Sequence, residues 1–131
     1  MFHDTIRNNI CLYEEFPEEQ LKKAIQLAGL TEFVDSLDQG LDTVISENGK
    51  NVSGGQIQRI GIARLIIRNY DVIIADEITA NLDENTTEAI MNNLLSLQCM
   101  LIVITHDTRS EFMNQFDSIY EIQDGIAQRC A

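Results

Sequence analysis

A chain of 131 residues with 44% apolar content is long enough for one modest domain and too apolar to be disordered. Its net charge of −12 disfavours nucleic acid or an anionic membrane as a direct partner, whereas a nucleotide needs only a local positive site and a metal ion. The three cysteines are scattered without metal-ligand spacing, which is typical of a reducing compartment. No signal peptide opens the chain and no apolar run reaches about 18 residues, so any link to a membrane is expected to come through a partner or further sequence.

The first part of the chain predicts helices only. Ile6 and Ile10 lie four residues apart, as in the apolar stripe of a helix. Pro17 suits the first position of a second helix, which Gly29 is expected to stop. Thr31 can cap a short third helix. No strand pattern occurs before the middle of the chain.

A longer helix is expected to begin after Ser53 and to run past Ile67. Ser53 and Gln56 have the spacing of a capping box, in which each side chain satisfies a backbone N–H of the other. Gly54 and Gly55 remove side-chain bulk there, so that a ligand can approach the backbone. A bare helix N-terminus attracts anions, because its N–H groups and dipole point outward. These residues alone fit an anion site and a simple well-capped helix equally well.

The pattern changes at Tyr70, where the chain becomes alternately strand and helix. Residues 72–75 form a short continuous apolar run, typical of a strand buried on both faces, and residues 100–105 form a second one. Asp83 can cap a helix between them that runs to about Leu97. A crossover of this length predicts that the two strands are parallel.

The last part of the chain predicts smaller elements. A weaker helix is expected at about residues 110–116 and a third strand at residues 118–123. Asp124-Gly125 is a hairpin turn into a further short strand. The predicted fold is therefore α/β: a helical subdomain over residues 1–68, then part of a parallel sheet layer over residues 69–131.

Candidate chemistry gathers where the two parallel strands end, because ligands of such sheets bind beyond the carboxyl ends. Asp76 and Glu77 end the first strand and His106 ends the second. Neighbouring strand residues point to opposite faces, so one carboxylate can hold Mg²⁺ through water while the other faces an attacking water as general base. Taken singly, each has an ordinary structural explanation: an Asp-Glu pair often starts a helix, and a lone histidine is more often a surface or core residue than a catalyst.

Four motifs follow one another in a specific order: VSGGQIQR at residues 52–59, VIIADE at 72–77, ANLD at 80–83 and ITH at 104–106. Together they resemble the C-terminal portion of an ATP-binding cassette (ABC) transporter nucleotide-binding domain, over essentially the whole chain. The order matches the family's signature, Walker B, D-loop and switch histidine. The resemblance implies a P-loop NTPase sheet, present here only in part.

The resemblance also implies roles for individual residues. Asp76 would hold Mg²⁺, Glu77 would be the catalytic carboxylate and His106 the switch histidine, all acting on ATP bound to the same subunit. The signature would contact the γ-phosphate held by a second nucleotide-binding domain, in a homodimer or heterodimer. The nucleotide-binding positions implied in this way are Ser53, Gly54, Gly55, Gln56 and, in the D-loop, Asp83.

Two further segments resemble exporters of the family. Phe2 with residues 5–10 (TIRNNI) looks like the segment after the Q-loop, and residues 43–49 (TVISENG) resemble the exporter X-loop. That loop, with Glu47, would touch the transmembrane domain, so the chain is expected in the cytoplasm at the inner face of the membrane. His106-Asp107 departs from the His-Arg usual in exporters and is more similar to importers.

The phosphate cradle of the family is missing from these residues. No G-x-x-x-x-G-K-[ST] occurs, the one Gly-Lys pair is Gly49-Lys50, and the Q-loop glutamine and adenine-stacking aromatic residue are missing too. A truncated reading frame, an internal start or a cloned fragment would each explain this. Losing several charged hydrogen bonds of about 1.5–3 kcal/mol each removes roughly 6 kcal/mol, or over four decades of affinity. The isolated chain is therefore expected not to bind or hydrolyse ATP, and its sheet to expose an edge prone to pairing.

Three functions remain open on the sequence. The first is a partial ABC ATPase domain, whose full-length form couples ATP binding and hydrolysis to transport. The second is a non-catalytic module that supplies a signature face to a complete cassette. The third, an ABC ATPase acting on DNA or in translation, is disfavoured by the acidic charge and the exporter-like loop. The sequence does not indicate which substrate is transported.

Overall fold

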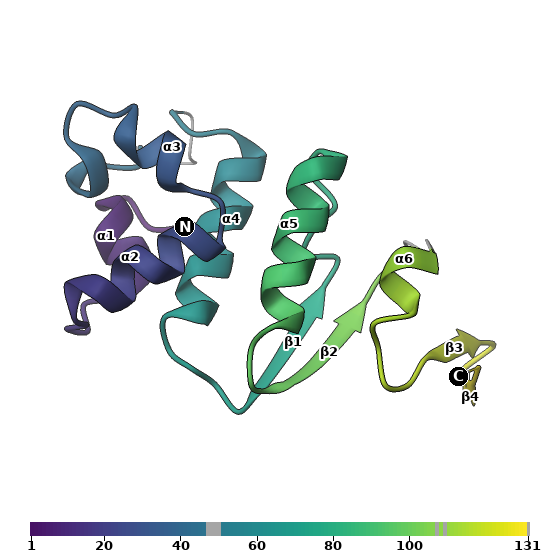
Figure 1. Ribbon diagram of the computed structural model, residues 1–131. Coiled ribbons are helices and arrows are strands. Elements are labelled where there is room, and N and C mark those ends of the chain that lie inside the picture. The colour runs from purple at the N-terminus through teal and green to yellow at the C-terminus, as the bar shows by residue number, and fades with distance from the viewer. Residues whose placement is uncertain (47–50, 107, 109, 131) are drawn as a thin grey trace.

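The computed structural model (Figure 1) describes residues 1–46, 51–106, 108 and 110–130. The expectations for Glu47, Gly49-Lys50 and Asp107 lie outside these residues. None of the helices described is long and apolar enough to cross a membrane. The elements, in chain order, are α1 Ile6–Cys11, α2 Glu18–Leu27, α3 Thr31–Asp35, the 3-10 helix η1 Gly40–Asp42, α4 Gly54–Ile66, β1 Val72–Asp76, α5 Glu84–Leu95, β2 Met100–Ile104, α6 Ser110–Met113, β3 Tyr120–Gln123 and β4 Ile126–Arg129.

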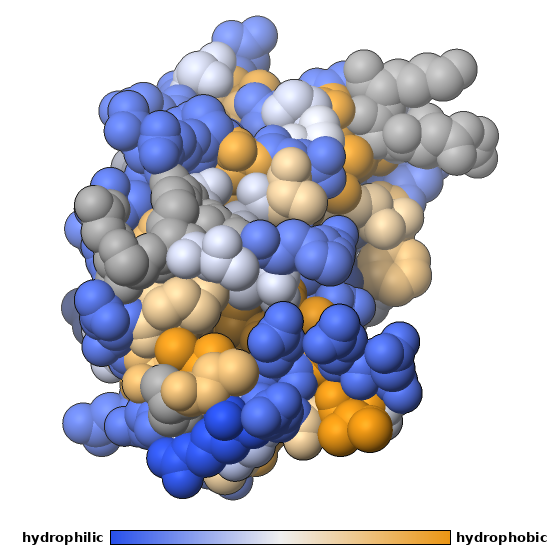
Figure 2. Space-filling model, turned by 90° about the vertical axis from the view of Figure 1, so that its right-hand side faces the viewer, coloured by the Kyte–Doolittle hydropathy of each residue, from blue (hydrophilic) through white to orange (hydrophobic). Residues whose placement is uncertain are grey.

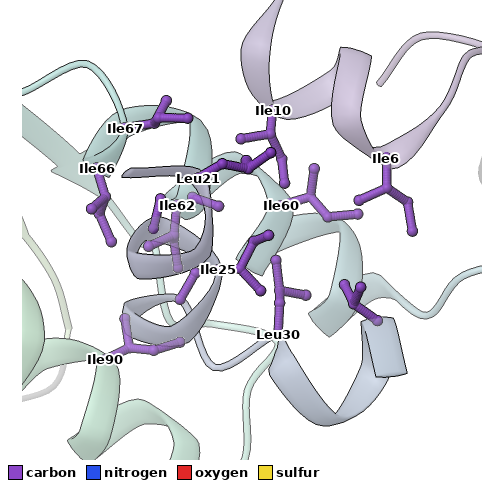
Figure 3. Close-up of a cluster of buried hydrophobic side chains, with 14 of the residues drawn as sticks. Ile6, Ile10, Leu21, Ile25, Leu30, Ile60, Ile62, Ile66, Ile67 and Ile90 are labelled. Carbon is purple, nitrogen blue, oxygen red and sulfur yellow. The ribbon is translucent and has the colours of Figure 1, made fainter. Parts of the chain in front are cut away.

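Helix α4 lies at the centre of the first half, with α1 and α2 packed against it (Figure 1). Its apolar side chains meet those of the other helices in one buried cluster, part of which Figure 3 shows. Ile60, Ile62 and Ile67 are at most 1% exposed. Ile90 of α5 belongs to the same cluster, so one core joins the helical half to the α/β half.

The open carbonyls at helix C-termini are satisfied by long side chains from neighbouring elements. Arg68 donates to the carbonyls of Ile10 (3.0 Å) and Cys11 (2.6 Å) at the end of α1. Gln20 of α2 donates to the carbonyl of Ile67 (2.6 Å) at the end of α4, and Asn93 of α5 donates to the carbonyl of Leu27 (2.8 Å) at the end of α2. The last four carbonyls of a helix have no partner within it, so these bonds hold the helices in fixed positions.

The second half contains the predicted parallel pair. β1 and β2 pair in parallel, from Val72 opposite Met100 to Asp76 opposite Ile104. Asp83 caps α5 as predicted, since its side chain accepts from the Thr86 backbone N–H. The crossover between the strands is therefore this helix, and the fold is α/β with a small parallel sheet.

The expectation that both strands are buried on both faces is wrong. Along β1, Ile73 and Ala75 are buried, whereas Val72 and Ile74 are 49% and 64% exposed. β2 shows the same alternation without a fully buried residue. Only the face toward α5 packs against a helix in the part of the chain that is described, so the opposite face, apolar in composition, meets solvent.

Three smaller expectations also need correction. Pro17 is the N-cap of α2, one position before the first helical residue. Thr31 is the first residue of α3, whose N-cap is Leu30 with no side-chain capping bond. The weak helix near residue 110 ends at Met113, three residues earlier than expected. Such shifts of one to three residues are usual at fraying helix ends.

The C-terminal hairpin forms at the predicted turn. β3 and β4 pair antiparallel, with Gln123 opposite Ile126. Asp124 and Gly125 have φ of 52° and 78°, the left-handed conformation that such a two-residue turn requires. Figure 2, from the side that carries this hairpin in Figure 1, shows hydrophobic patches among hydrophilic surface. The exposed apolar side chains of the hairpin are Tyr120, Ile122 and Ile126.

Ile60→Ala is expected to reduce the free energy of unfolding by about 2–5 kcal/mol, because it leaves a cavity beside three helices. Ile122→Ala, at a side chain that is 76% exposed, should change it by less than about 0.5 kcal/mol. Urea denaturation followed by circular dichroism measures both values. Equal effects of the two variants would contradict the position assigned to the core.

Replacing Ile74 and Ile102 together by threonine is expected to reduce self-association, because both side chains lie on the exposed apolar face of the sheet. Sedimentation velocity measures the association, and urea denaturation should show a change within about 1 kcal/mol. Ile73→Thr is the matched control, since Ile73 is 3% exposed on the opposite face and the change should destabilise the fold. Unchanged association of the double variant would show that the chain does not self-associate through this face.

Candidate nucleotide site

The carboxyl ends of β1 and β2 bring Glu77 and His106 together. His106 Nε2 lies 3.2 Å from Glu77 Oε1, across the ends of neighbouring strands. The Glu77 backbone N–H donates to the carbonyl of Ile104 at 2.9 Å, which extends the parallel ladder by one bond. Both side chains are open to solvent, His106 at 95% and Glu77 at 53% exposure. This is the edge at which parallel sheets bind ligands.

Glu77 has an unusual backbone conformation. Its φ is 47°, in the left-handed region that residues other than glycine adopt only when their surroundings hold them there. The strand alternation therefore ends at Asp76, and Glu77 turns toward His106. Observed strain at a candidate catalytic carboxylate supports a functional interpretation of this position.

A cavity of about 370 Å³ opens beside these two side chains. Its size lies at the lower end of small-molecule sites. Hydroxyl, carboxyl and imidazole groups line it together with a few apolar side chains, so polar groups face the space where a ligand would bind. The lining residues are Glu77, Thr79, Ala80, Leu82, Glu84, Thr87, Thr105 and His106.

The predicted capping box forms at the start of α4. Ser53 Oγ accepts from the Gln56 N–H at 3.2 Å, and Gln56 Oε1 accepts from the Ser53 N–H at 2.7 Å. A Cβ on Gly54 would meet nothing within 4 Å. The first turn of α4 is therefore bare on the side of Gly54, and its dipole gives the partial positive charge that suits an anion.

Gly55 differs from Gly54, because it packs against the segment after Glu77. A Cβ on Gly55 would lie 3.1 Å from the carbonyl oxygen of Asn81 and 3.3 Å from Leu82 Cδ2. Only glycine allows this close approach without moving the backbone of Asn81. The start of α4 and residues 78–82 are thus in direct contact, which the sequence did not predict.

Asp83 caps α5 with both carboxylate oxygens. Oδ1 accepts from the Thr86 N–H at 3.0 Å and Oδ2 from the Thr86 hydroxyl at 2.6 Å. The side-chain bond to Thr86, followed by the backbone bond, lowers the pKa of this carboxyl below its ordinary value. The carboxylate form is therefore favoured, and its contribution to the cap is lost only as the pH falls through that lowered pKa.

Asp76 ends β1 with an exposed side chain. No group of three His, Cys, Asp or Glu side chains suited to a metal ion occurs among the described residues. Mg²⁺ commonly takes one or two carboxylates and completes its shell with water and substrate phosphate. Asp76 therefore fits as one ligand of such an ion, with the others supplied by nucleotide and solvent.

The family model described as "ABC transporter" matches residues 2–80, more than half of the chain. The chain belongs to the ABC transporter family. Similar proteins include ATP-dependent lipid A-core flippases: that of Salmonella typhimurium is 42% identical over 130 residues, and those of Vibrio cholerae and Escherichia coli are 41% and 40% identical. The alignments cover 95–96% of this chain and 22% of each flippase, so the chain spans about a fifth of the length of these curated relatives.

A solved structure leads to the same family. A bacterial Atm1-family ABC exporter with ATP bound superposes with a TM-score of 0.85 at 30% identity, over 95% of this chain and 22% of that exporter. Nucleotide-binding domains of the ABC family bind ATP with Mg²⁺. The α/β fold and the family predicted from the four motifs are thereby confirmed.

Sequence reasoning missed the residues that connect the signature helix to the rest of the ABC domain. Gln58 bonds to the backbone of Glu77 and Asn81, and Arg59 donates to the carbonyl of Gly29 at 2.6 Å. A helical pattern assigns both residues to a polar surface, because it gives no information on which distant carbonyl lies within reach. In the sequence, the available signal for these contacts was the Gln-Arg pair at the end of the VSGGQIQR motif.

Gly55→Ala and Gly54→Ala are expected to have opposite effects on stability. Gly54→Ala should raise the free energy of unfolding by about 0.5 kcal/mol, because alanine restricts the unfolded chain. Gly55→Ala should lose that gain or reverse it, since the new methyl group would lie 3.1 Å from the Asn81 carbonyl oxygen. Urea denaturation measures the difference, and ¹⁵N spectra should show Asn81 shifted in the second variant. Equal stabilisation by both alanines would contradict the contact.

Proposed function

We propose that this chain is part of the nucleotide-binding domain of an ABC exporter, whose full-length form couples ATP binding and hydrolysis to transport. The observation that carries the proposal is the convergence of Glu77 and His106 at 3.2 Å at the carboxyl ends of β1 and β2. Each residue alone has a structural explanation. A purely structural role explains much less well why the two side chains meet at the edge where parallel sheets bind ligands.

In this proposal the strand-end residues act on ATP bound by the same subunit. Asp76 holds Mg²⁺, and Glu77 accepts a proton from the attacking water as general base, an effect of about 10²–10⁴ in rate. His106, within 3.2 Å of the Glu77 carboxylate, orients that water and contacts the transferring phosphate. The strained φ of Glu77 supports this role, because it directs the carboxylate toward the histidine.

The signature residues serve a different ATP molecule. Ser53, Gly54, Gly55 and Gln56 present the bare turn of α4 to the γ-phosphate held by a second nucleotide-binding domain. A Cβ on Gly54 would meet nothing within 4 Å, which supports an approach of the γ-phosphate from outside the chain. Asp83 lies in the D-loop, at the face that such a partner would cover.

The exporter-like segments support a transmembrane partner. Thr5 and Val44 form an antiparallel bridge, which brings the segment after the Q-loop beside the start of the predicted X-loop. The Ile6 N–H donates to Thr43 at 3.0 Å and the Ile45 N–H to Asp4 at 2.9 Å. The segment after the Q-loop thus lies beside residues 43–45, and contact of this region with a transmembrane domain would place the chain at the inner face of the membrane.

A non-catalytic module is the second candidate function. The 131 residues include a complete capping box and signature but no P-loop motif. Such a chain could complete the ATP site of another subunit without hydrolysing ATP itself. Its site would then act only on a phosphate presented by the partner.

Titration calorimetry is expected to show no binding of Mg-ATP to the isolated chain near 10 µM, because the contacts of a P-loop contribute roughly 6 kcal/mol or more. The nucleotide would have to be supplied by a partner. A measured dissociation constant in the 10 µM range would overturn this expectation.

Mixing the chain with an ABC subunit that carries a P-loop separates the two candidates. Association that requires Mg-ATP, measured by sedimentation velocity, favours the module, whereas no association favours a piece of a single domain. If they associate, Ser53→Arg should abolish the complex by blocking the bare turn of α4. Ser36→Arg, with the same change in size and charge at the exposed end of α3, should leave it intact.

A further inference from the structure

Gln58 bonds to two backbone groups with one side-chain amide. Its Nε2 donates to the carbonyl of Glu77 at 3.1 Å, and its Oε1 accepts from the Asn81 N–H at 3.3 Å. The residue lies in the second turn of α4, two positions after Gln56 of the capping box. Both ends of the amide are thus used between the signature helix and the segment that follows β1.

The carbonyl that Gln58 holds belongs to the strained residue. Glu77 has a φ of 47°, and a residue in this region needs several contacts to stay there. Its N–H donates to Ile104, and its carbonyl accepts from the Ala80 N–H at 3.1 Å as well as from Gln58. Ile104 belongs to β2, and Gln58 is the contact that comes from α4. Loss of it would let the peptide after Glu77 rotate and move the carboxylate away from His106.

The other end of the link is fixed at the start of α4. Gly55 lies against the Asn81 carbonyl, so this helix turn and residues 77–82 touch at two points. Arg59, next to Gln58, donates to Gly29 at 2.6 Å and to Gly55 at 3.4 Å. The first two turns of α4 therefore have little freedom to move independently of the segment that carries Glu77.

We propose that Gln58 is a positioning residue that transmits a displacement of the signature turn to the backbone of Glu77. Binding of a phosphate at Ser53–Gln56 moves that turn, and Gln58 passes the movement to the carboxylate that serves the other ATP molecule. The proposal rests on the proposed function for the roles of these two sites. The bonds of Gln58, together with the contact of Gly55 with Asn81, are independent of these roles.

The test uses the ¹⁵N-labelled full chain and no nucleotide, so its outcome is independent of whether the chain acts as an ATPase. In Gln58→Met, the Asn81 amide should exchange with solvent about fivefold faster, as expected for one lost hydrogen bond. The three-bond HN–Hα coupling of Glu77, which reports φ, should change at the same time. Gln26→Met, at an exposed glutamine of α2, is the matched control and should alter neither.

Gln58→Glu separates the two bonds. Glutamate can still accept from the Asn81 N–H but cannot donate to the Glu77 carbonyl. Exchange at Asn81 should therefore stay within about twofold of the unmodified chain, while the Glu77 coupling changes as in Gln58→Met. An unchanged Glu77 coupling in both variants would overturn the assignment of Gln58 as the residue that holds Glu77.

Transmission is tested by disturbing the signature turn. Ser53→Ala removes the cap and should shift the Glu77 amide resonance in the chain that has Gln58. In the Gln58→Met background, the shift at Glu77 caused by Ser53→Ala should fall by at least half. A merely structural Gln58 would lower stability and leave this shift unchanged, and that result would refute the proposal.

Discussion

The rest of the structure depends on helix α4, which is buried at its far end and bare at its start. Ile60, Ile62 and Ile67 lie in the core, and α1 and α2 pack against α4, so the axis of α4 is fixed by packing. Its first turn is satisfied by its own side chains through Ser53 and Gln56. The direction in which its N–H groups point is therefore determined by the core against which the rest of the helix packs, so the turn is already formed before an anion binds.

Three of the cations of this acidic chain are committed to its own backbone. The chain has 9 basic side chains against 21 acidic ones, and three of them lie on or just after α4. Arg59, Arg64 and Arg68 donate to the carbonyls of Gly29, Asn9 and Cys11, respectively, and Arg68 is also 5.4 Å from the ring of Phe16. These arginines join the helices and are not directed at a ligand. In the proposed function, these three arginines would therefore not attract a phosphate to the signature, whereas the dipole and backbone N–H groups of α4 would.

The fold class, the order of the elements and the N-caps of α4 and α5 were predictable, because they depend on residues near one another in sequence. Ser53 with Gln56, and Asp83 with Thr86, are local interactions of this kind. The burial of β1 was not predictable, since a continuous apolar run does not tell whether another layer covers its second face. Nor was the bond of Gln58 to Glu77, which spans 19 residues and exists only because the core places α4 beside the end of β1.

The exposed sheet face and the exposed position of Asp76 are consequences of the same alternation. Val72, Ile74 and Asp76 are two residues apart along β1 and therefore share one face, opposite to Ile73 and Ala75. Any element that buries Val72 and Ile74 must also lie next to Asp76. Glu77 does not follow this alternation, because its φ is left-handed, and its carboxylate lies beside His106. An element that covered the apolar face would thus also lie beside Asp76, the proposed Mg²⁺ ligand, whereas the pairing of Glu77 with His106 does not depend on such a cover.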